Sequence, residues 1–215
     1  MNILAVDCCL RLTGIAVMRN DTIIGHVKEY LGRKQTAELP KMCCEIMDMY
    51  NLSWPELDYI ALTNGPGYFT GIRVGAAYAT GLAYACGVKM IPVSTLELLP
   101  YTFRKTHKAG KILTVIYAGH GFVYASCDGF LEAGEYSHTQ ILSWLNKNPE
   151  AVIISDDPER TALNVKISQV EPDVSAVCEI ANANINRAID PENLRIYYLR
   201  APQGAESQKG LVTPR

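Results

Sequence analysis

The stretch Asn64-Gly-Pro-Gly-Tyr-Phe-Thr-Gly-Ile-Arg-Val-Gly75 decides the fold of this chain, because it passes from a loop into a helix. The residues before it, 59–63, are apolar and partly β-branched, and they predict a buried strand. Gly65-Pro66-Gly67 forces a turn, and Thr70 is a good N-cap for the helix that follows. A strand, a glycine turn and a helix N-terminus can together hold an anion. An ordinary turn between strand and helix is the alternative, and the local pattern favours it.

The helix expected after this turn carries small residues on two rows with a spacing of four. The rows are Gly71, Gly75 and Ala79, and Ala77, Gly81 and Ala85. Each glycine inside a helix costs about 1 kcal/mol relative to alanine. We therefore expect a compensating close approach of another backbone, either within the fold or from a partner chain. Arg73 lies inside this helix, and we expect it to reach a carboxylate or a loop carbonyl, including one across an interface.

The composition is that of an ordinary globular protein. The 215 residues are 48% hydrophobic and 20% charged, with a net charge of −2. A weakly acidic chain is a poor candidate for binding nucleic acid alone, because that affinity comes mainly from phosphate neutralisation. The seven cysteines form no CxxC and the four histidines no HxxH or HxxxH spacing, so we expect reduced thiols and no metal site. With no signal or membrane-length segment visible, we expect a cytoplasmic protein.

Hydrophobic periodicity predicts an α/β fold with the order βββαβαβα in the first hundred residues. The expected strands are 1–7, 14–18, 22–28, 59–63 and 89–93, and the expected helices begin near residues 36, 70 and 95. Three antiparallel strands followed by crossovers predict a mixed sheet covered by helices.

The second half repeats this pattern in a reduced form. We expect strands at 111–118, 122–127 and 151–155, helices from 139 and over 174–188, and an extended segment at 196–200. A charged, glycine-containing segment separates the halves, so we predict an N-terminal lobe at 1–106 and a reduced C-terminal lobe at 107–207. Residues 208–215 resemble an appended protease-site linker, so we expect them to lie outside both lobes.

Together, a strand that ends in Asp7, a glycine turn back into a second strand, and this element order resemble the actin/sugar-kinase/Hsp70-like (ASKHA) ATPase fold. Residues 65–75 look like the GPGSFTGLRIG signature of the TsaB (YeaZ) family, with Tyr68 in place of the serine. Further segments similar to that family are Ile3–Asp7, Ile91–Glu97 and Ile196–Arg200.

The resemblance implies a non-catalytic subunit needed to make N6-threonylcarbamoyladenosine (t6A) in tRNA, in a family also filed with the M22 glycoproteases. The implied partners are a TsaD-like catalytic paralogue and, through that complex, a TsaE-like ATPase and tRNA. A homodimer is expected when the protein is alone, and no membrane contact. In the family the two helices of the first lobe form the dimer interface. On those helices we predict the interface residues Leu39, Met42, Ile46, Met49, Gly71, Arg73, Gly75, Tyr78 and Leu82.

Asp7 matches the position where active members of this superfamily orient Mg²⁺ and water. Cys8 and Cys9 follow it here, and a thiol is a poor partner for phosphate or Mg²⁺. The second-lobe counterpart reads Tyr117-Ala-Gly-His-Gly-Phe-Val-Tyr124, where many relatives have Asp-Ala-Arg-x-Gly-Glu-Val-Tyr. We therefore expect a strand-end Asp7 bonded to loop N–H groups, no catalytic residue, no cofactor and at most a vestigial ATP/Mg²⁺ site. His120 is interpreted as a loop residue.

Two other functions stay open at this stage. An ATP-dependent phosphotransferase or ATPase of the same fold would need Asp7 to support nucleotide binding. An M22-type peptidase would need a metal or nucleophile site, and the sequence displays neither. We favour a pseudo-ATPase accessory subunit of a tRNA threonylcarbamoyltransferase complex.

Overall fold

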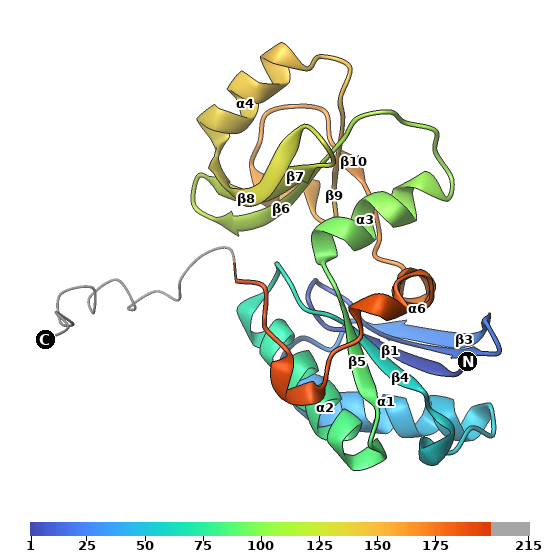
Figure 1. The fold of residues 1–215 in the computed structure, drawn as a ribbon. Coiled ribbons are helices and arrows are strands. Elements are labelled where there is room, and N and C mark those ends of the chain that lie inside the picture. Colours follow the sequence, from blue (N-terminus) through green and yellow to red (C-terminus); the bar gives the residue numbers. More distant parts are fainter. Residues whose placement is uncertain (199–215) are drawn as a thin grey trace, which may run out of the picture.

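The computed structural model describes residues 1–198 and contains two five-stranded mixed sheets, one in each lobe (Figure 1). The first has the order β3-β2-β1-β4-β5, from β1 (Ile3–Asp7), β2 (Thr13–Arg19), β3 (Thr22–Glu29), β4 (Tyr59–Thr63) and β5 (Lys89–Val93). The second has the order β10-β9-β6-β7-β8, from β6 (Ile112–Gly119), β7 (Phe122–Cys127), β8 (Leu131–Ser137), β9 (Val152–Ser155) and β10 (Ser168–Gln169). Counted from β8, the second order repeats the first. This confirms the predicted α/β fold with two actin/Hsp70-like lobes.

The central strand β1 is buried along its whole length and ends at Asp7. It pairs with β2 in antiparallel register, from Ile3 opposite Met18 to Asp7 opposite Gly14. On its other side it pairs with β4 in parallel. The carboxyl ends of β1 and β4 therefore lie at one edge of the sheet, and the glycine turn begins there.

Helices cover both faces of the first sheet (Figure 1). Leu4 and Val6 point to one face and pack in a core with α1 (Gln35–Met49) and α2 (Phe69–Cys86). Ile3 and Ala5 point to the other face and pack against α6 (Val174–Ala183). The alternation follows from the strand period of two. The remaining helical segments are η1 (Gly32–Lys34), η2 (Trp54–Glu56), α3 (Thr95–Arg104), α4 (His138–Lys147), α5 (Pro158–Thr161), η3 (Ile185–Arg187) and η4 (Pro191–Asn193).

The last part of the described chain returns to the first lobe, which the sequence did not predict. We placed a helix over 174–188 in a C-terminal lobe at 107–207. The helix α6 ends at Ala183 and packs on the first sheet, where its apolar residues cover an otherwise bare apolar face. The chain then pairs Ile189 with Met90 of β5. The position of the lobe boundary near 106 stays a prediction.

The extended segment expected at 196–200 is described only as far as residue 198, and it forms no regular strand there. The rest of that segment and residues 208–215 lie outside the described residues. Within residues 1–198, no helix combines the length and the hydropathy that crossing a membrane requires.

Candidate functional site

Asp7 ends β1 as a buried carboxylate, with only 2% of its surface exposed. Its Oδ1 accepts a hydrogen bond from Oγ1 of Thr63 (2.5 Å) and one from the backbone N–H of Cys9 (3.1 Å). Burial raises the pKa of Asp7, although both hydrogen bonds act in the opposite direction. The bond from a loop N–H is the one expected of a strand-end residue.

The two cysteines after Asp7 are buried, and their thiols are protonated at neutral pH. Burial raises the pKa of Cys8 well above its ordinary value and that of Cys9 to about 12, and the Asp7 charge adds to both increases. The Cys9 thiol donates to the carbonyl oxygen of Thr63 (3.2 Å). A protonated thiol is a poor nucleophile, so these two cysteines are not suited to nucleophilic catalysis.

The glycine turn lies against the loop after β1. The N–H of Tyr68 donates to the carbonyl oxygen of Cys9 (2.7 Å), and a Cβ on Gly67 would lie 2.1 Å from that same oxygen. The helix α2 begins at Phe69 with Tyr68 as its N-cap. The predicted N-cap at Thr70 is therefore wrong, because the bond to Cys9 sets the helix start earlier.

Arg160 bridges the two lobes across the end of the sheets. Its guanidinium lies 4.7 Å from the ring centre of Tyr68, in the glycine turn, and 4.7 Å from that of Tyr117, at the end of β6. The short helix α5 holds it there, since the side chain of Asp157 caps the helix by accepting from the N–H of Arg160 (3.2 Å). A cation between two aromatic rings is a favourable arrangement. We call Tyr68, Tyr117 and Arg160 the interlobe stack.

A second carboxyl group faces Asp7 from the other lobe. Burial raises the pKa of Asp156 to about 6, and the charges of Asp157 and Asp7 add to the increase. Asp156 also raises the pKa of Tyr68, which is raised chiefly by burial. Arg160 acts on Tyr68 in the opposite direction, so charges of both signs lie beside the interlobe stack.

The sequence offered weak signals for the residues that form this stack. Asp157 and Pro158 after a buried strand predict a helix start, but nothing marks Arg160 as a partner of rings in two distant segments. Among residues 1–198, no three His, Cys, Asp or Glu side chains are placed to hold a metal ion together. His120 lies exposed in the turn between β6 and β7.

The structure separates the predicted interface residues into two groups. Five have no exposed face, because α1 and α2 turn these positions toward the sheet or the loop after β1; they are Leu39, Met42, Ile46, Gly71 and Gly75. Met49 is 71% exposed, Arg73 is exposed, and Tyr78 and Leu82 are half-buried. The interface, with all nine of its residues, stays a prediction, and five of these residues are buried in the single chain.

The inner row of α2 explains its glycines. A Cβ on Gly71 would lie 2.0 Å from the carbonyl oxygen of Cys8, and one on Gly75 would lie 3.1 Å from the Cβ of Cys8. Ala79 is fully buried on the same row. The expected close approach of another backbone is confirmed within the fold for Gly71.

The outer row of α2 is Ala77, Gly81 and Ala85, and all three residues are exposed. A Cβ on Gly81 would meet no atom within 4 Å. Tyr84, beside this row, is 58% exposed, and its hydroxyl bonds to Glu192 (3.1 Å). The sequence left open which row faces inward, and the structure shows that this one faces outward.

Arg73 lies at the N-terminal end of the outward face. Its guanidinium lies 3.7 Å from the ring centre of Phe69, and its Nε donates to the hydroxyl of Tyr198 (3.0 Å). The rings of Phe69 and Tyr198 are 5.6 Å apart. Within residues 1–198 the partners of Arg73 are thus aromatic side chains and not a carboxylate or a loop carbonyl, and the expected contact across an interface stays a prediction.

These features define a class: a two-lobed α/β protein of the actin/Hsp70 type, with side chains bridging its interlobe cleft and an exposed small-residue helix face. A family model described as "TsaD: tRNA N6-adenosine threonylcarbamoyltransferase" matches residues 20–179. The chain belongs to this family, and in sequence and fold it resembles the TsaB (YeaZ) proteins within it.

Two curated relatives carry the name "tRNA threonylcarbamoyladenosine biosynthesis protein TsaB". The protein of Escherichia coli (strain K12) is 30% identical over 153 residues, which cover 71% of this chain and 62% of the relative. The protein of Bacillus subtilis (strain 168) is 32% identical over 124 residues, which cover 58% and 53%. The matches thus cover less than two thirds of each relative.

Two solved structures share the fold. YeaZ from Pseudomonas aeruginosa superposes with a TM-score of 0.70 at 21% identity, covering 92% of this chain and 99% of that one. A Pseudomonas aeruginosa protein described as similar to the peptidase YeaZ has a TM-score of 0.77 at 21% identity, with 93% and 99% covered.

Proposed function

We propose that this chain is a non-catalytic, partner-binding subunit of the machinery that makes N6-threonylcarbamoyladenosine in tRNA. It docks onto a TsaD-type catalytic paralogue and reaches a TsaE-like ATPase and tRNA through that complex. The observation that carries the proposal is the interlobe stack, in which Arg160 contacts a ring of the glycine turn and a ring of β6 and so ties the two lobes together. The names of the curated relatives support the pathway.

The residues at the cleft do not fit an ATP–Mg²⁺ site. Oδ1 of Asp7 already accepts two hydrogen bonds, and protonated thiols follow it. These contacts favour a pseudo-ATPase over a phosphotransferase. The peptidase alternative gains no support from the cysteines of this loop, because their raised pKa makes them poor nucleophiles.

The docking surface that we propose is the outward side of α2 with the end of α1. We call it the outer face, and it consists of Met49, Phe69, Arg73, Ala77, Gly81 and Tyr84. The distance between packed helices depends on the side chains at their contact, so the small residues at 77 and 81 let a partner helix come close. Exposed apolar and aromatic residues flank this strip, as at protein interfaces. The same face serves a homodimer when the protein is alone.

The docking surface is tested by placing a long side chain at Gly81, which lies in the row of small residues on the outer face. Gly81→Arg should weaken binding to a TsaD-type paralogue at least about tenfold, or about 1.4 kcal/mol, measured by titration calorimetry. The matched Gly81→Ala variant should bind within about threefold of the original, a change below 1 kcal/mol. Both should keep the original melting temperature or exceed it, because nothing lies within 4 Å of this position. Unchanged binding by Gly81→Arg would move the interface elsewhere.

The assignment as an accessory subunit is tested by reconstitution. The protein alone should show neither ATPase nor transferase activity, and it should restore transfer when mixed with cognate TsaD-type and TsaE-type proteins. Full transfer without it would contradict the proposal. Calorimetry with ATP and Mg²⁺ distinguishes the accessory subunit from an ATPase or phosphotransferase. The enzyme alternative requires saturable binding of ATP that the Asp7→Ala variant loses.

A further inference from the structure

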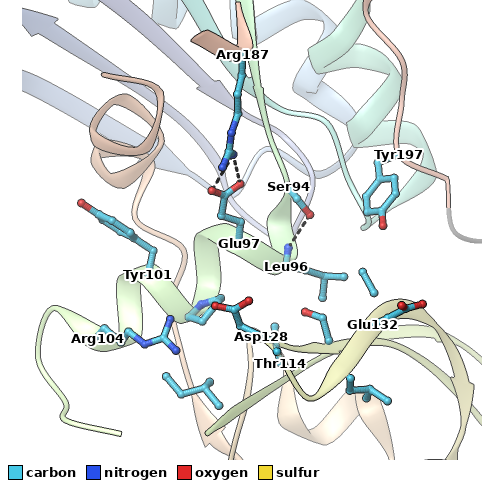
Figure 2. A pocket seen from close by; sticks show the side chains of 16 residues that line it. Ser94, Leu96, Glu97, Tyr101, Arg104, Thr114, Asp128, Glu132, Arg187 and Tyr197 are labelled. Carbon is cyan, nitrogen blue, oxygen red and sulfur yellow. Dashed lines mark hydrogen bonds and ion pairs between the residues drawn. The ribbon is translucent and has the colours of Figure 1, made fainter. Parts of the chain in front are cut away.

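A groove of about 720 Å³ lies between α3 and the β7–β8 hairpin, away from the interlobe stack (Figure 2). Leu96 and Pro100 of α3 and Leu131 of β8 form apolar parts of its wall. Thr114 of β6 and Ser126 of β7, which are paired across the sheet, also line it. The volume falls in the range of about 300–1,000 Å³ that is usual for small-molecule sites.

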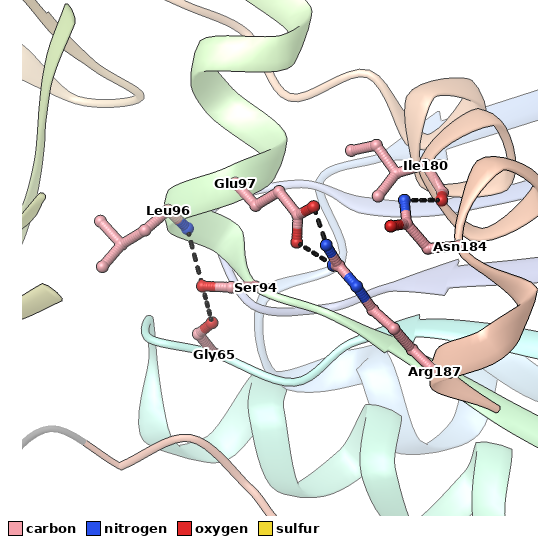
Figure 3. Close-up of polar contacts among 7 residues, drawn as sticks. All are labelled: Gly65, Ser94, Leu96, Glu97, Ile180, Asn184 and Arg187. Carbon is pink, nitrogen blue, oxygen red and sulfur yellow. Dashed lines mark hydrogen bonds and ion pairs between the residues drawn. The ribbon is translucent and has the colours of Figure 1, made fainter. Parts of the chain in front are cut away.

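The groove carries an excess of negative charge. Glu97 accepts two hydrogen bonds from the guanidinium of Arg187 (2.9 and 3.0 Å), so this pair is neutral (Figure 3). Asp128, Glu132 and Arg104 also line the groove, and none of them makes an ion pair with another residue among 1–198. Two carboxylates and one guanidinium leave a net charge of −1, which suits one further cation.

The cation that fits this groove is an organic one. In the part of the chain that the structure describes, no three His, Cys, Asp or Glu side chains are placed to hold a metal ion together. An amine or a guanidinium needs only charge-assisted hydrogen bonds to a carboxylate. Its aliphatic stem can lie along apolar surface while the charged end stays with the carboxylates, and the groove offers such a surface at Leu96, Pro100 and Leu131.

A buried hydroxyl adds a second point of recognition. Thr114 is fully buried and lines the groove, and its Oγ1 has no hydrogen-bond partner among residues 1–198. A buried polar group without a partner is costly, and a ligand that supplies the partner relieves this cost. A hydroxyl can donate to a carbonyl oxygen or accept from an N–H, so an amide group satisfies it in either orientation. The ligand that the groove favours therefore carries an amide besides its cation.

We propose that this groove binds a small organic cation, an amine or guanidinium on an aliphatic stem that also carries an amide. The cation lies at the carboxylates of Asp128 and Glu132, and the amide bonds to Oγ1 of Thr114. In Figure 2, Asp128 lies between Arg104 and Glu132, so Arg104 disfavours a ligand with a second positive charge. Arginine and lysine derivatives with blocked amino and carboxyl groups have this chemistry. The site is independent of the docking function proposed above, because it shares no residue with the outer face.

Titration of the full chain with two matched probes tests the need for a positive charge. N-acetylarginine amide carries the guanidinium, the stem and amide groups, and N-acetylcitrulline amide has an uncharged urea in place of the guanidinium. The first should bind with a Kd below about 1 mM, which is ordinary for a ligand of this size. The second should bind at least about tenfold more weakly, because it lacks the charge-assisted bond.

Amide NMR signals show where the first probe binds. Those of Gly129 and Leu131, which line the groove, should shift during the titration, and that of Gly81 on the outer face should stay in place. The absence of saturable binding, equal affinity for the two probes, or shifts only outside the groove would each overturn the proposal.

Variants of the charged residues test the carboxylates. The double variant Asp128→Asn, Glu132→Gln should bind N-acetylarginine amide at least about tenfold more weakly and N-acetylcitrulline amide with unchanged affinity. The substitution at 128 preserves the hairpin, because Asn-Gly and Asp-Gly favour the same turn. Glu159→Gln on α5, outside the groove, is the matched control and should alter neither affinity. Arg104→Gln should strengthen binding of the charged probe about threefold, a gain that no folding defect produces. Unchanged affinity of the double variant for the charged probe would overturn the proposal.

Thr114→Val tests the contact with the buried hydroxyl. Valine has nearly the same shape, so the variant without ligand should keep the original melting temperature or exceed it, because it loses a buried hydroxyl that has no partner. It should bind both probes about three- to tenfold more weakly, because both carry the amide that bonds to Oγ1. Equal affinity of the variant and the original protein for both probes would overturn the placement of the amide at Thr114.

Discussion

The inner and outer rows of α2 have the same kinds of residue at the same spacing, but the inner row packs within the fold and the outer row faces outward. Gly71 and Gly75 of the inner row lie against Cys8, where a Cβ on Gly71 would clash with a backbone oxygen and one on Gly75 would be tightly packed. Gly81 of the outer row has open space around it. A glycine in a helix therefore indicates that another backbone comes close to the helix. Its burial shows whether that backbone belongs to the same chain or would have to come from a partner.

The two rows belong to two different regions of the molecule. The inner row continues into the cleft, where Asp7 and the interlobe stack are held by contacts within the chain. The outer row continues into the exposed residues Met49 and Tyr84. The cleft is thus a region of satisfied contacts and the outer face one of unused surface. Substitutions on the inner row and in the interlobe stack should therefore change the stability of the folded protein, whereas substitutions on the outer face should not lower it.

The largest effect is expected from Gly71→Ala. The new Cβ would lie 2.0 Å from a backbone oxygen of Cys8, which cannot move without shifting the loop after β1. We expect the free energy of unfolding to fall by about 3 kcal/mol or more, because overpacking costs far exceed the gain of about 1 kcal/mol in helix propensity. Urea denaturation measures the change. A loss below 1 kcal/mol would show that the inner row is not tightly packed.

Asp156→Asn should change how stability depends on pH. The folded protein holds the pKa of Asp156 at about 6, above its ordinary value of 3.8. The folded state therefore binds this proton more tightly, and stability is lost as pH rises from about 4 through 6. The variant lacks that loss, so relative to the original it should gain about 2–3 kcal/mol between pH 4 and pH 7. Urea denaturation at both pH values measures this gain, and an identical pH profile in both proteins would contradict it.

Arg160→Ala should remove the interlobe stack at a smaller cost. Cation–π contacts contribute about 0.5–1 kcal/mol each at exposed sites, and Arg160 is exposed. We expect a loss of about 1–2 kcal/mol in the free energy of unfolding. Arg160→Lys is the matched variant and should lose less, because it keeps the charge but not the planar group. Equal losses in both variants would mean that the planar guanidinium contributes nothing.

The smallest effect, and the one of opposite sign, is expected from Gly81→Ala. Replacing a helical glycine in open space should raise the free energy of unfolding by about 0.5–1 kcal/mol through helix propensity. Urea denaturation measures this change. A destabilised Gly81→Ala variant would remove the distinction between the two rows.

The fold was predictable from the sequence because its strands are short, apolar and separated by clear turns. Residues 3–7 and 59–63 are buried strands as expected. The sequence could not place α6, since an apolar helix fits either sheet and only the three-dimensional arrangement shows which face is bare. It also misplaced the start of α2, because the bond from Tyr68 to Cys9 outweighs the local preference of Thr70.

The site was less predictable than the fold. The reading of Asp7 followed from its neighbours Cys8 and Cys9, which are adjacent in the chain. Arg160 was missed because its ring partners are far away in sequence, and a lone arginine carries no local signal. The interface residues on α1 were chosen for their hydrophobicity, and for Leu39 the same property explains its burial in the core.

The return of α6 to the first sheet has a consequence for how the molecule acquires its structure. Ile3 and Ala5 remain without cover until residues 174–183 have been synthesised. The first lobe therefore cannot finish folding ahead of the second, although its own strands and two of its helices come first along the chain. The two lobes form a single cooperative unit that should melt in one transition, and a chain cut between them would expose an apolar sheet face prone to aggregation.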